Sequence, residues 1–440
     1  MNPYLPTSQT EQDAMLAAAG VQTPLAFYRA VPDRLRLDAF DGIPAGISEF
    51  EAKKSFERMA RNNTAFDVCL RGGGAYRHFI PAAVGHMAGR AEFVTAYTPY
   101  QAEISQGILQ AIFEYQTGIC RLTGMDASNA SLYDGATAAG EAVCMCADAR
   151  RREVCVAKTT APHVLAVLET YCRAHGLVLR MLDERAGQLN PDFELSAQTA
   201  CVYVQSPNFY GIFEDIDALA EKAHAVGAKL VVGINPIALG LTEPPTQADV
   251  VCGEGQPLGI PVSFGGPYLG ILACKKDMMR KLPGRIVGQT VDKDGKTAYC
   301  LTLQTREQHI RREKASSSVC SNQALCALRA GIYLASMGGT GVAEVARQCY
   351  HKAHYACEQF AKAGFARVHH APFFHEFLTD CKTRAKAVAK TLAAHGILSG
   401  LPVGENRMLW CVTECVSRED IDRTAAILAR EATVARGVQA

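Results

Sequence analysis

The spacing of apolar positions changes near residue 150. Beyond this point, short apolar segments rich in β-branched residues alternate with segments whose apolar residues recur at helical spacing. The predicted strands are 153–157, 177–182, 200–205, 228–234, 248–252 and 268–273, and the predicted helices between them include 163–174 and 215–225. This alternation is typical of an α/β fold with a mainly parallel, doubly wound sheet. Ligands bind such sheets at the carboxyl ends of the strands, so we expect the chemistry in the loops that follow them.

Residues 96–142 predict two helices joined by a polar loop. Thr98-Pro99-Tyr100-Gln101 has the form of a capping box with proline at the first helical position. Apolar side chains then follow at helical spacing, at Ile104, Ile108, Ile112, Tyr115 and Ile119, and Gly124 suits the end of this helix. The second helix is predicted to begin at Asp134-Gly135-Ala136-Thr137-Ala138, where backbone N–H groups could bind an anion.

The flanking regions predict three domains. Residues 1–60 combine short helical patterns with scattered prolines, as in an N-terminal arm that lies over another surface. Residues 61–330 hold the predicted sheet and form the large domain. Residues 331–440 predict a smaller α+β domain, with strands near 374–378 and 408–413 and helices near 337–364, 384–395 and 418–430.

Composition and charge exclude several classes of function. The 440 residues are 48% hydrophobic and carry a formal net charge of +1, so no overall field favours nucleic acid or an acidic membrane. No apolar run reaches the roughly 20 residues that a membrane span needs, and the N-terminus lacks the pattern of a secretion signal. We therefore expect a cytoplasmic protein whose 17 cysteines are reduced thiols. Cys144 and Cys146 fit a helix core better than a metal site, and we predict no metal.

A glycine-rich turn, Arg71-Gly-Gly-Gly-Ala-Tyr76, precedes His78. It lacks the lysine and hydroxyl residue of a phosphate-binding loop, and no strand–turn–helix unit frames it. Because glycines allow a backbone to approach a ligand closely, this turn and His78 are candidates for lining a cleft. His163 has no charged residues near it in the sequence, which favours a role in packing.

Long motifs at several points of the chain carry a family resemblance. They are YTPYQAEISQG, SNASLYDGATA, ADVVCGEGQPLG, SFGGPYLG and IRREKASSSVCSNQAL. Together they resemble the glycine cleavage P-protein family, glycine dehydrogenases (decarboxylating) that use pyridoxal phosphate on an aspartate-aminotransferase-like fold. The resemblance extends over essentially the whole chain. Some bacteria divide this enzyme into two subunits, and the length and motifs here resemble the first, or alpha, subunit.

Pyridoxal chemistry requires a Schiff-base lysine, a carboxylate at the pyridinium nitrogen and donors for the phosphate. At the expected carboxylate position the sequence has Gly233, or Asn235 if the register moves by two, and neither carries a negative charge. Gln256 stands near the expected lysine position, and Lys275 and Lys276 come too late in the chain. Only the phosphate-binding helix start, Asp134, Gly135, Ala136 and Thr137, keeps the family pattern. We interpret these four positions, together with Gly233 and Gln256, as a vestigial cofactor site.

The resemblance therefore implies that pyridoxal phosphate is bound to a lysine of a beta subunit, in an alpha2-beta2 heterotetramer. It also implies glycine as substrate and a lipoylated H-protein as partner. The residues predicted to face the partner's site are Tyr97, Thr98, Tyr100 and Gln106, although the tyrosines could equally be half-buried core residues. Glu103, expected to share a helix face with Gln106, could assist proton transfer or pair with an arginine.

A polar, basic stretch supplies the predicted phosphate contacts. Its residues Arg312, Lys314, Ser316, Ser317 and Ser318 could donate to the partner's cofactor phosphate, or form a solvated basic turn. Two alternatives for the whole chain stay open. It could be an independent pyridoxal enzyme such as an aminotransferase, or a catalytically dead homologue that acts as a scaffold or regulator.

Overall fold

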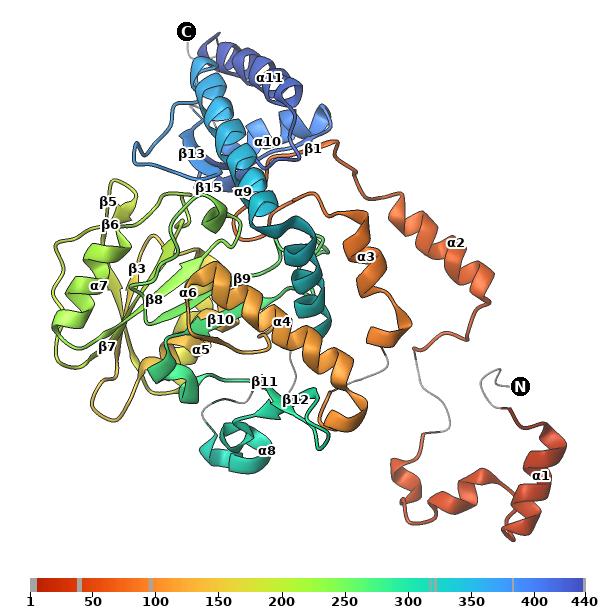
Figure 1. Ribbon diagram of the computed structural model, residues 1–440. Helices are drawn as coiled ribbons and strands as arrows, with labels where there is room; N and C mark the ends of the chain where they lie inside the picture. The colour runs from red at the N-terminus through yellow and green to blue at the C-terminus, as the bar shows by residue number, and fades with distance from the viewer. Residues whose placement is uncertain are drawn as a thin grey trace. The chain divides into compact units, whose positions relative to one another are not determined.

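The computed structural model describes residues 6–37, 42–94, 98–315, 317, 319, 323–381 and 384–437. The chain divides into two compact units, Met1–Thr64 and Ala65–Ala440 (Figure 1). The first unit contains helices α1 (Gln9–Ala18) and α2 (Glu49–Ala60). Each begins with a capping box, in which the hydroxyl of Ser8 or Ser48 accepts from the backbone three residues later and a glutamate side chain returns to the cap.

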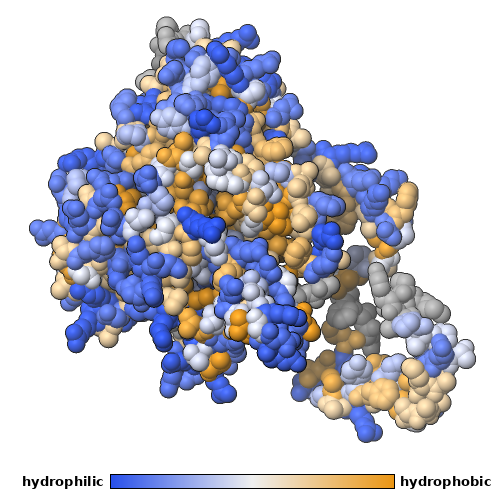
Figure 2. All heavy atoms as spheres, viewed as in Figure 1, coloured by the Kyte–Doolittle hydropathy of each residue, from blue (hydrophilic) through white to orange (hydrophobic). Residues whose placement is uncertain are grey.

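The first unit has an apolar surface and no buried residue among those described. Leu37 is 76% exposed, Phe50 75% and Phe56 68%. Figure 2 shows apolar atoms on the surface of this unit. Apolar surface of this extent is typical of a segment that packs against another protein surface.

The second unit is built on a seven-stranded sheet in the order β2-β10-β9-β8-β7-β3-β4. Five adjacent strands are parallel, namely β4 (Val178–Leu182), β3 (Glu153–Ala157), β7 (Thr199–Ser206), β8 (Lys229–Ile234) and β9 (Val250–Glu254). At one edge β10 (Gly270–Cys274) runs antiparallel to β9, and β2 (Ala127–Ser128) pairs antiparallel with β10. The mainly parallel α/β sheet predicted from the sequence is confirmed.

Helices cover both faces of this sheet (Figure 1). They are α5 (Gly135–Cys146) and α6 (Pro162–Ala174) on one face, and α4 (Gln106–Thr123), α7 (Ile216–Ala225) and α9 (Ala324–Lys362) on the other. Side chains along strand β3 alternate between the two faces of the sheet. Val154 and Val156 pack toward the first group of helices, whereas Cys155 and Ala157 pack toward the second. Both faces are apolar, as expected for strands buried on both sides.

The predicted start of helix α4 is wrong. The helix begins at Gln106 and not near Pro99, and a separate 3₁₀ turn, η4 (Ala102–Ile104), precedes it. The Gln106 side chain donates to the carbonyl of Tyr299 and accepts from its N–H, which ties this point of the chain to β12 (Thr297–Thr302). This tertiary contact overrides the local capping signal, and Ile104 is 80% exposed as a result. The helix ends where predicted, at Gly124 with φ of 69°.

The C-terminal part of this unit has its own antiparallel sheet in the order β13-β16-β15. Its elements are β13 (Glu376–Asp380), α10 (Ala385–Ala394), β15 (Leu401–Val403), β16 (Arg407–Cys411) and α11 (Arg418–Gly437). Its core contains Trp410, Phe360 and Phe377, which are buried together. Helix α9 crosses residues 330 and 331 and is interrupted by non-helical backbone at Gly338, so the predicted division between 61–330 and 331–440 stays a prediction.

The remaining elements connect these parts. They are β1 (Val68–Cys69) paired with β14 (Ile397–Leu398), β5 (Glu184–Arg185) paired with β6 (Gln188–Leu189), β11 (Ile286–Val291) paired with β12, α3 (Ala82–Ala88) and α8 (Gln308–Arg311). Within the described residues, no helix has the length and apolar character to cross a membrane. The sixteen cysteines described are all free thiols.

Candidate functional site

A cavity of about 370 Å³ lies at the carboxyl ends of β7, β8 and β9. Its wall also includes the start of helix α5, the start of helix α6 and the glycine-rich residues 72–76. The predicted vestigial residues Asp134, Gly135, Ala136 and Gly233 all line it. The cavity therefore lies where this type of sheet binds its ligands.

The helix start in this cavity is already occupied by a side chain of the same protein. Asp134 caps α5, and its Oδ1 accepts from the Thr137 N–H at 2.7 Å. The Gly135 N–H, which points out of the helix end, donates to Oε2 of Glu254 at 2.9 Å. Oε1 of Glu254 accepts from the N–H groups of Gln256 at 2.8 Å and Leu269 at 3.1 Å. The Glu254 carboxylate thus takes the place of an external anion at the helix N-terminus.

The position of the expected carboxylate is closed as well. A Cβ atom at Gly233 would lie 2.6 Å from the Tyr203 hydroxyl and 2.9 Å from Cγ of Gln205. Asn235 is buried, and its Nδ2 lies 3.2 Å from Nε2 of His375. Neighbouring side chains therefore occupy the space in which an aspartate at 233 would have to point.

Gln256, at the expected lysine position, has a structural role. It is 1% exposed, its Oε1 accepts from the Tyr76 N–H at 2.8 Å, and its Nε2 donates to the carbonyls of Tyr76 and Ile260. These bonds attach the glycine-rich segment to the end of β9. Lys275 and Lys276 follow β10, whose Cys274 pairs with Val250 at the amino end of β9, away from the cavity.

The predicted cleft-lining role of the glycine-rich turn holds for residues 72–76. Gly73 and Gly74 have φ of 84° and 124°, values that favour glycine. The Gly73 N–H donates to Oε1 of Glu376 at 2.7 Å, and the Tyr76 hydroxyl donates to Oε2 at 2.8 Å. Glu376, which the sequence analysis did not single out, is therefore part of the same wall.

His163, for which the sequence favoured a role in packing, also lines the cavity. A Cβ atom at Gly74 would lie 2.7 Å from Cε1 of His163, so only glycine allows the loop to pass this close. Burial lowers the pKa of His163, which favours the neutral imidazole.

Of the residues predicted to form the wall facing the partner, Thr98, Tyr100 and Gln106 are described, and they are not part of the cavity lining. Tyr100 is 49% exposed, and its hydroxyl accepts from Nη2 of Arg285 at 2.7 Å. The Arg285 guanidinium also lies 5.0 Å from the centre of the Tyr100 ring, and the His309 ring lies at 5.7 Å. Thr98 is half-buried nearby in sequence, and Tyr97 lies outside the described residues. Arg285 is 5% exposed, so it holds the Tyr100 hydroxyl from the interior.

Glu103 and Gln106 do not share a helix face as predicted. Glu103 is exposed in the η4 turn, whereas Gln106 begins α4. The amide of Gln106 is already used in bonds to the backbone of Tyr299 and to the Ala102 carbonyl. Gln106 therefore fixes the path of the chain before α4.

The basic stretch is brought together with other cations. Lys314 lines a hollow of about 270 Å³ together with Arg280, Arg306 and Arg311. Arg312 is exposed and is not part of that lining. The Ser317 hydroxyl donates to Oε1 of Glu141 on α5 at 2.8 Å, and Ser316 and Ser318 lie outside the described residues.

Comparison with known proteins places these features in a family. Residues 2–428 match the glycine cleavage system P-protein family. The chain belongs to this family. It is 48% identical over 440 residues to the "probable glycine dehydrogenase (decarboxylating) subunit 1" of Desulforamulus reducens, covering 97% of this chain and 99% of the relative.

Solved structures agree with this assignment. A crystal structure of glycine decarboxylase (P-protein) of the glycine cleavage system, in inhibitor-bound form, is 38% identical with a TM-score of 0.93, covering 97% of this chain and 99% of that one. An aspartate aminotransferase from Thermus thermophilus is 14% identical with a TM-score of 0.58, covering 83% and 99% of the two chains, and shares the fold alone. The aspartate-aminotransferase-like fold expected from the sequence is confirmed.

Pyridoxal phosphate, the cofactor of this P-protein fold, does not fit the cavity of this chain. The Glu254 carboxylate fills the position where the cofactor phosphate would bind. Gly233 provides no carboxylate for the pyridinium nitrogen, and the side chain of Gln256 is hydrogen-bonded to backbone groups. Among the residues that the structure describes, no lysine lines the cavity.

The approach of α5 to β9 leads to a stability prediction. A Cβ atom at Gly135 would lie 2.7 Å from the backbone nitrogen of Glu254 and 2.9 Å from its Cα. Gly135→Ala should therefore push the helix start away from Glu254 and lower the free energy of unfolding by about 1–3 kcal/mol. Gly85→Ala on α3, where nothing lies within 4 Å, is the matched control and should be neutral or stabilising in the same urea titration. Equal stability of the two variants would contradict the close contact.

Glu376 leads to a prediction about pH. Burial raises its pKa from 4.5 to about 7, although its bonds from Tyr76 and Gly73 act in the opposite direction. Between pH 4.5 and about 7 the folded state then binds more protons than the unfolded state. The stability contributed by the protonated Glu376 is therefore fully present below pH 4.5 and is lost as the pH rises through about 7. Glutamine resembles the protonated acid, so Glu376→Gln should prevent about 3 kcal/mol of the decrease in unfolding free energy that the rise in pH causes.

The measurement is the midpoint of thermal unfolding from about pH 5 to pH 8. Relative to the unchanged protein, Glu376→Gln should become steadily more stable as the pH rises. The exposed Glu57→Gln serves as the control and should run parallel to the unchanged protein. If the Glu376→Gln curve also runs parallel, Glu376 is ionised throughout and the burial argument fails.

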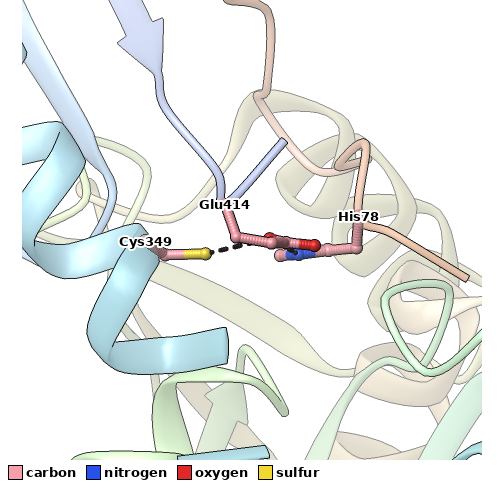
Figure 3. Close-up of side chains that lie close together, drawn as sticks. All are labelled: His78, Cys349 and Glu414. Atoms are coloured by element: carbon pink, nitrogen blue, oxygen red, sulfur yellow. Dashed lines mark hydrogen bonds and ion pairs between the residues drawn. The ribbon is translucent and has the colours of Figure 1, made fainter. Parts of the chain in front are cut away.

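A second buried polar cluster consists of His78, Cys349 and Glu414, which are not among the residues that line the cavity. Nδ1 of His78 lies 2.8 Å from Oε2 of Glu414, and Sγ of Cys349 lies 3.3 Å from the same oxygen (Figure 3). Oε1 of Glu414 accepts from the Phe79 N–H at 2.6 Å. This cluster joins the segment after the glycine-rich turn to helix α9 and to the loop after β16. His78, which the sequence offered as a cleft residue, belongs to this cluster.

Proposed function

We propose that this chain is the alpha subunit of a heteromeric glycine decarboxylase and carries no cofactor lysine. The observation that supports this most strongly is the Glu254 carboxylate in the helix start where a cofactor phosphate would bind. The close relative from Desulforamulus reducens is named as subunit 1, which implies a second subunit. We infer a beta subunit that binds pyridoxal phosphate through its own lysine, in an alpha2-beta2 heterotetramer.

The proposed reaction is the loss of CO2 from glycine and the transfer of the aminomethyl group to the lipoyl arm of the H-protein. The cofactor on the beta subunit supplies the chemistry that accepts electrons from the reacting carbon. This chain supplies a wall that positions the substrate and excludes water. The complex is proposed to be cytoplasmic, in agreement with the free thiols of all described cysteines.

Tyr100 is the proposed centre of that wall. Its hydroxyl accepts from Arg285, so its own proton is available for an acceptor outside this chain. The acceptor that we propose is the glycine carboxylate or an oxygen of the partner's cofactor. Tyr97 and Thr98 are proposed as its neighbours, while the bonds of Gln106 to Tyr299 support a positioning role for that residue. For Glu103 we retain proton transfer as a proposal, supported by its exposure.

The basic hollow supports the proposed contact with the partner's phosphate. The hollow is lined by Lys314, Arg280, Arg306 and Arg311, and no acidic residue lines it within the described part of the chain. Arg306 donates to the carbonyl of Gly284, next to Arg285, so the hollow and the Tyr100 contact are linked through the chain. Guanidinium groups suit phosphate because they donate along two parallel bonds. Arg312 and the serines at 316, 317 and 318 remain proposed contacts to the partner's cofactor phosphate.

Reconstitution tests the proposed function. This chain alone, the beta subunit alone and the mixture are each supplied with glycine labelled at the carboxyl carbon and with lipoylated H-protein. Release of labelled CO2 is expected from the mixture only. Release from this chain alone would identify an independent enzyme. If the beta subunit alone matches the mixture, this chain is a scaffold or regulator.

A further inference from the structure

The cavity at the ends of β7, β8 and β9 remains open although the P-protein cofactor does not fit it. Its volume of about 370 Å³ lies within the range of small-molecule sites. Glu254 fills only the helix start, so space remains between that carboxylate and the glycine-rich segment. What the cavity could bind depends on the charges and hydrogen-bonding groups that still face it.

The lining is acidic. Among the residues that the structure describes, it contains the carboxyl groups of Asp134, Glu254 and Glu376 and no lysine or arginine. The basic side chain described in the lining is His163, and burial lowers its pKa, which favours the uncharged form. Burial raises the pKa of Glu254 and of Glu376 to about 7, so near neutral pH each is partly ionised. An anion would meet these acidic groups without a compensating cation among the described lining residues. The Glu254 carboxyl group occupies the helix start where this fold normally binds a phosphate. This position therefore favours a cation over an anion.

These carboxyl groups can still accept hydrogen bonds. A carboxylate has about four acceptor positions. Glu376 uses one position on each oxygen, for the Gly73 N–H and the Tyr76 hydroxyl. Glu376 is 4% exposed, so water has little access to its carboxyl group. A donor on a ligand could therefore fill the acceptor positions that remain. A cation that enters would also offset the cost of ionising a buried acid.

Aromatic side chains complete the site. Tyr76 and Tyr268 line the cavity together with the glycine backbone of the 72–74 segment. Aromatic faces attract organic cations, and a planar group with two N–H donors matches a carboxylate. We propose that this cavity binds a small planar organic cation of the amidinium or guanidinium class, which pairs with Glu376 and packs against Tyr76.

This inference is argued from residues of this chain. Its probe is benzamidine, with benzamide and benzoate as neutral and anionic molecules of nearly the same shape. Binding is measured by titration calorimetry on the complex of this chain with its beta subunit. These probes lack the free primary amine that reacts readily with a pyridoxal aldehyde, and an unchanged visible spectrum during the titration shows that the partner's cofactor is not involved.

We expect benzamidine to bind once per copy of this chain, at least about tenfold more tightly than benzamide, with no binding of benzoate. Glu376→Gln should weaken benzamidine by about tenfold or more. Glu153→Gln, at the amino end of β3 and therefore at the end of the strands away from the cavity, is the control and should bind as the unchanged protein does.

Three results would overturn the proposal. The first is the absence of saturable benzamidine binding to the unchanged complex. The second is benzoate or benzamide binding as tightly as benzamidine. The third is unchanged benzamidine affinity in Glu376→Gln when circular dichroism shows that the variant is folded. Because the first two use the unchanged protein, a variant that fails to fold still leaves the proposal testable.

Discussion

Glu414→Ala is expected to lower the free energy of unfolding by about 3–5 kcal/mol. The Glu414 carboxylate accepts from His78, from the Phe79 N–H and from the Cys349 thiol. Alanine would leave these donors without partners in the interior, where an unmade hydrogen bond is costly. Urea unfolding at neutral pH, followed by circular dichroism, measures the change. Glu57→Ala on the exposed surface of α2 is the control and should change stability little.

The same carboxylate has a distinct dependence on pH. Burial tends to raise the pKa of Glu414, but its bonds from His78, Phe79 and Cys349 outweigh burial and lower it from 4.5 to about 2. Because the folded value is depressed, the contribution is present above pH 4.5 and is lost as the pH falls toward 2. The cost of Glu414→Ala should therefore shrink on acidification. A cost that stays constant would show that the carboxylate acts only by packing.

Arg285→Lys is expected to lower kcat/KM for glycine decarboxylation by the reconstituted complex by about tenfold to a hundredfold. Arg285 donates to the Tyr100 hydroxyl at 2.7 Å while its guanidinium packs on the Tyr100 ring. Lysine keeps the charge but loses the planar group that makes both contacts. The Tyr100 hydroxyl would then be free to rotate away from the partner's site. Arg285 is thus a positioning residue that acts through Tyr100.

A double-mutant cycle with Tyr100→Phe distinguishes positioning from general structural support. If Arg285 acts through Tyr100, the double variant should be little worse than the more damaged single variant. Arg151→Lys is the matched control, because Arg151 also donates to backbone carbonyls, those of Thr199 and Val226, but near the amino ends of β7 and β8. It should cost stability without loss of activity. Additive losses in the cycle, or full activity in Arg285→Lys, would contradict the proposed wall.

Periodicity predicted the sheet well because its strands are buried on both faces. Strand β3 matches its predicted span, since every residue from Val154 to Ala157 packs against a covering helix. The start of α4 could not be predicted in the same way. Its position is set by the bonds of Gln106 to Tyr299, a residue 193 positions later in the chain. A local capping signal contains no information about such a partner.

The candidate site likewise has features that residue types alone predict and features that depend on tertiary contacts. The absence of an acid at Gly233 and of a lysine at Gln256 follows from residue types alone, whereas the filling of the helix start by Glu254 is a tertiary contact. A signal for Glu254 and His163 was nonetheless present in the sequence. Both follow predicted strands, at the carboxyl ends where this fold places its chemistry, and that rule could have marked them as cavity residues.

The location of the cofactor tests the central claim most directly. The reconstituted complex is treated with borohydride, which fixes pyridoxal phosphate to the lysine that holds it, and the labelled peptide is identified by mass spectrometry. We expect label on a lysine of the beta subunit and none on this chain, because no lysine is among the described residues that line its cavity. A labelled lysine in this chain would show that it holds the cofactor itself, contrary to the proposed division between the subunits.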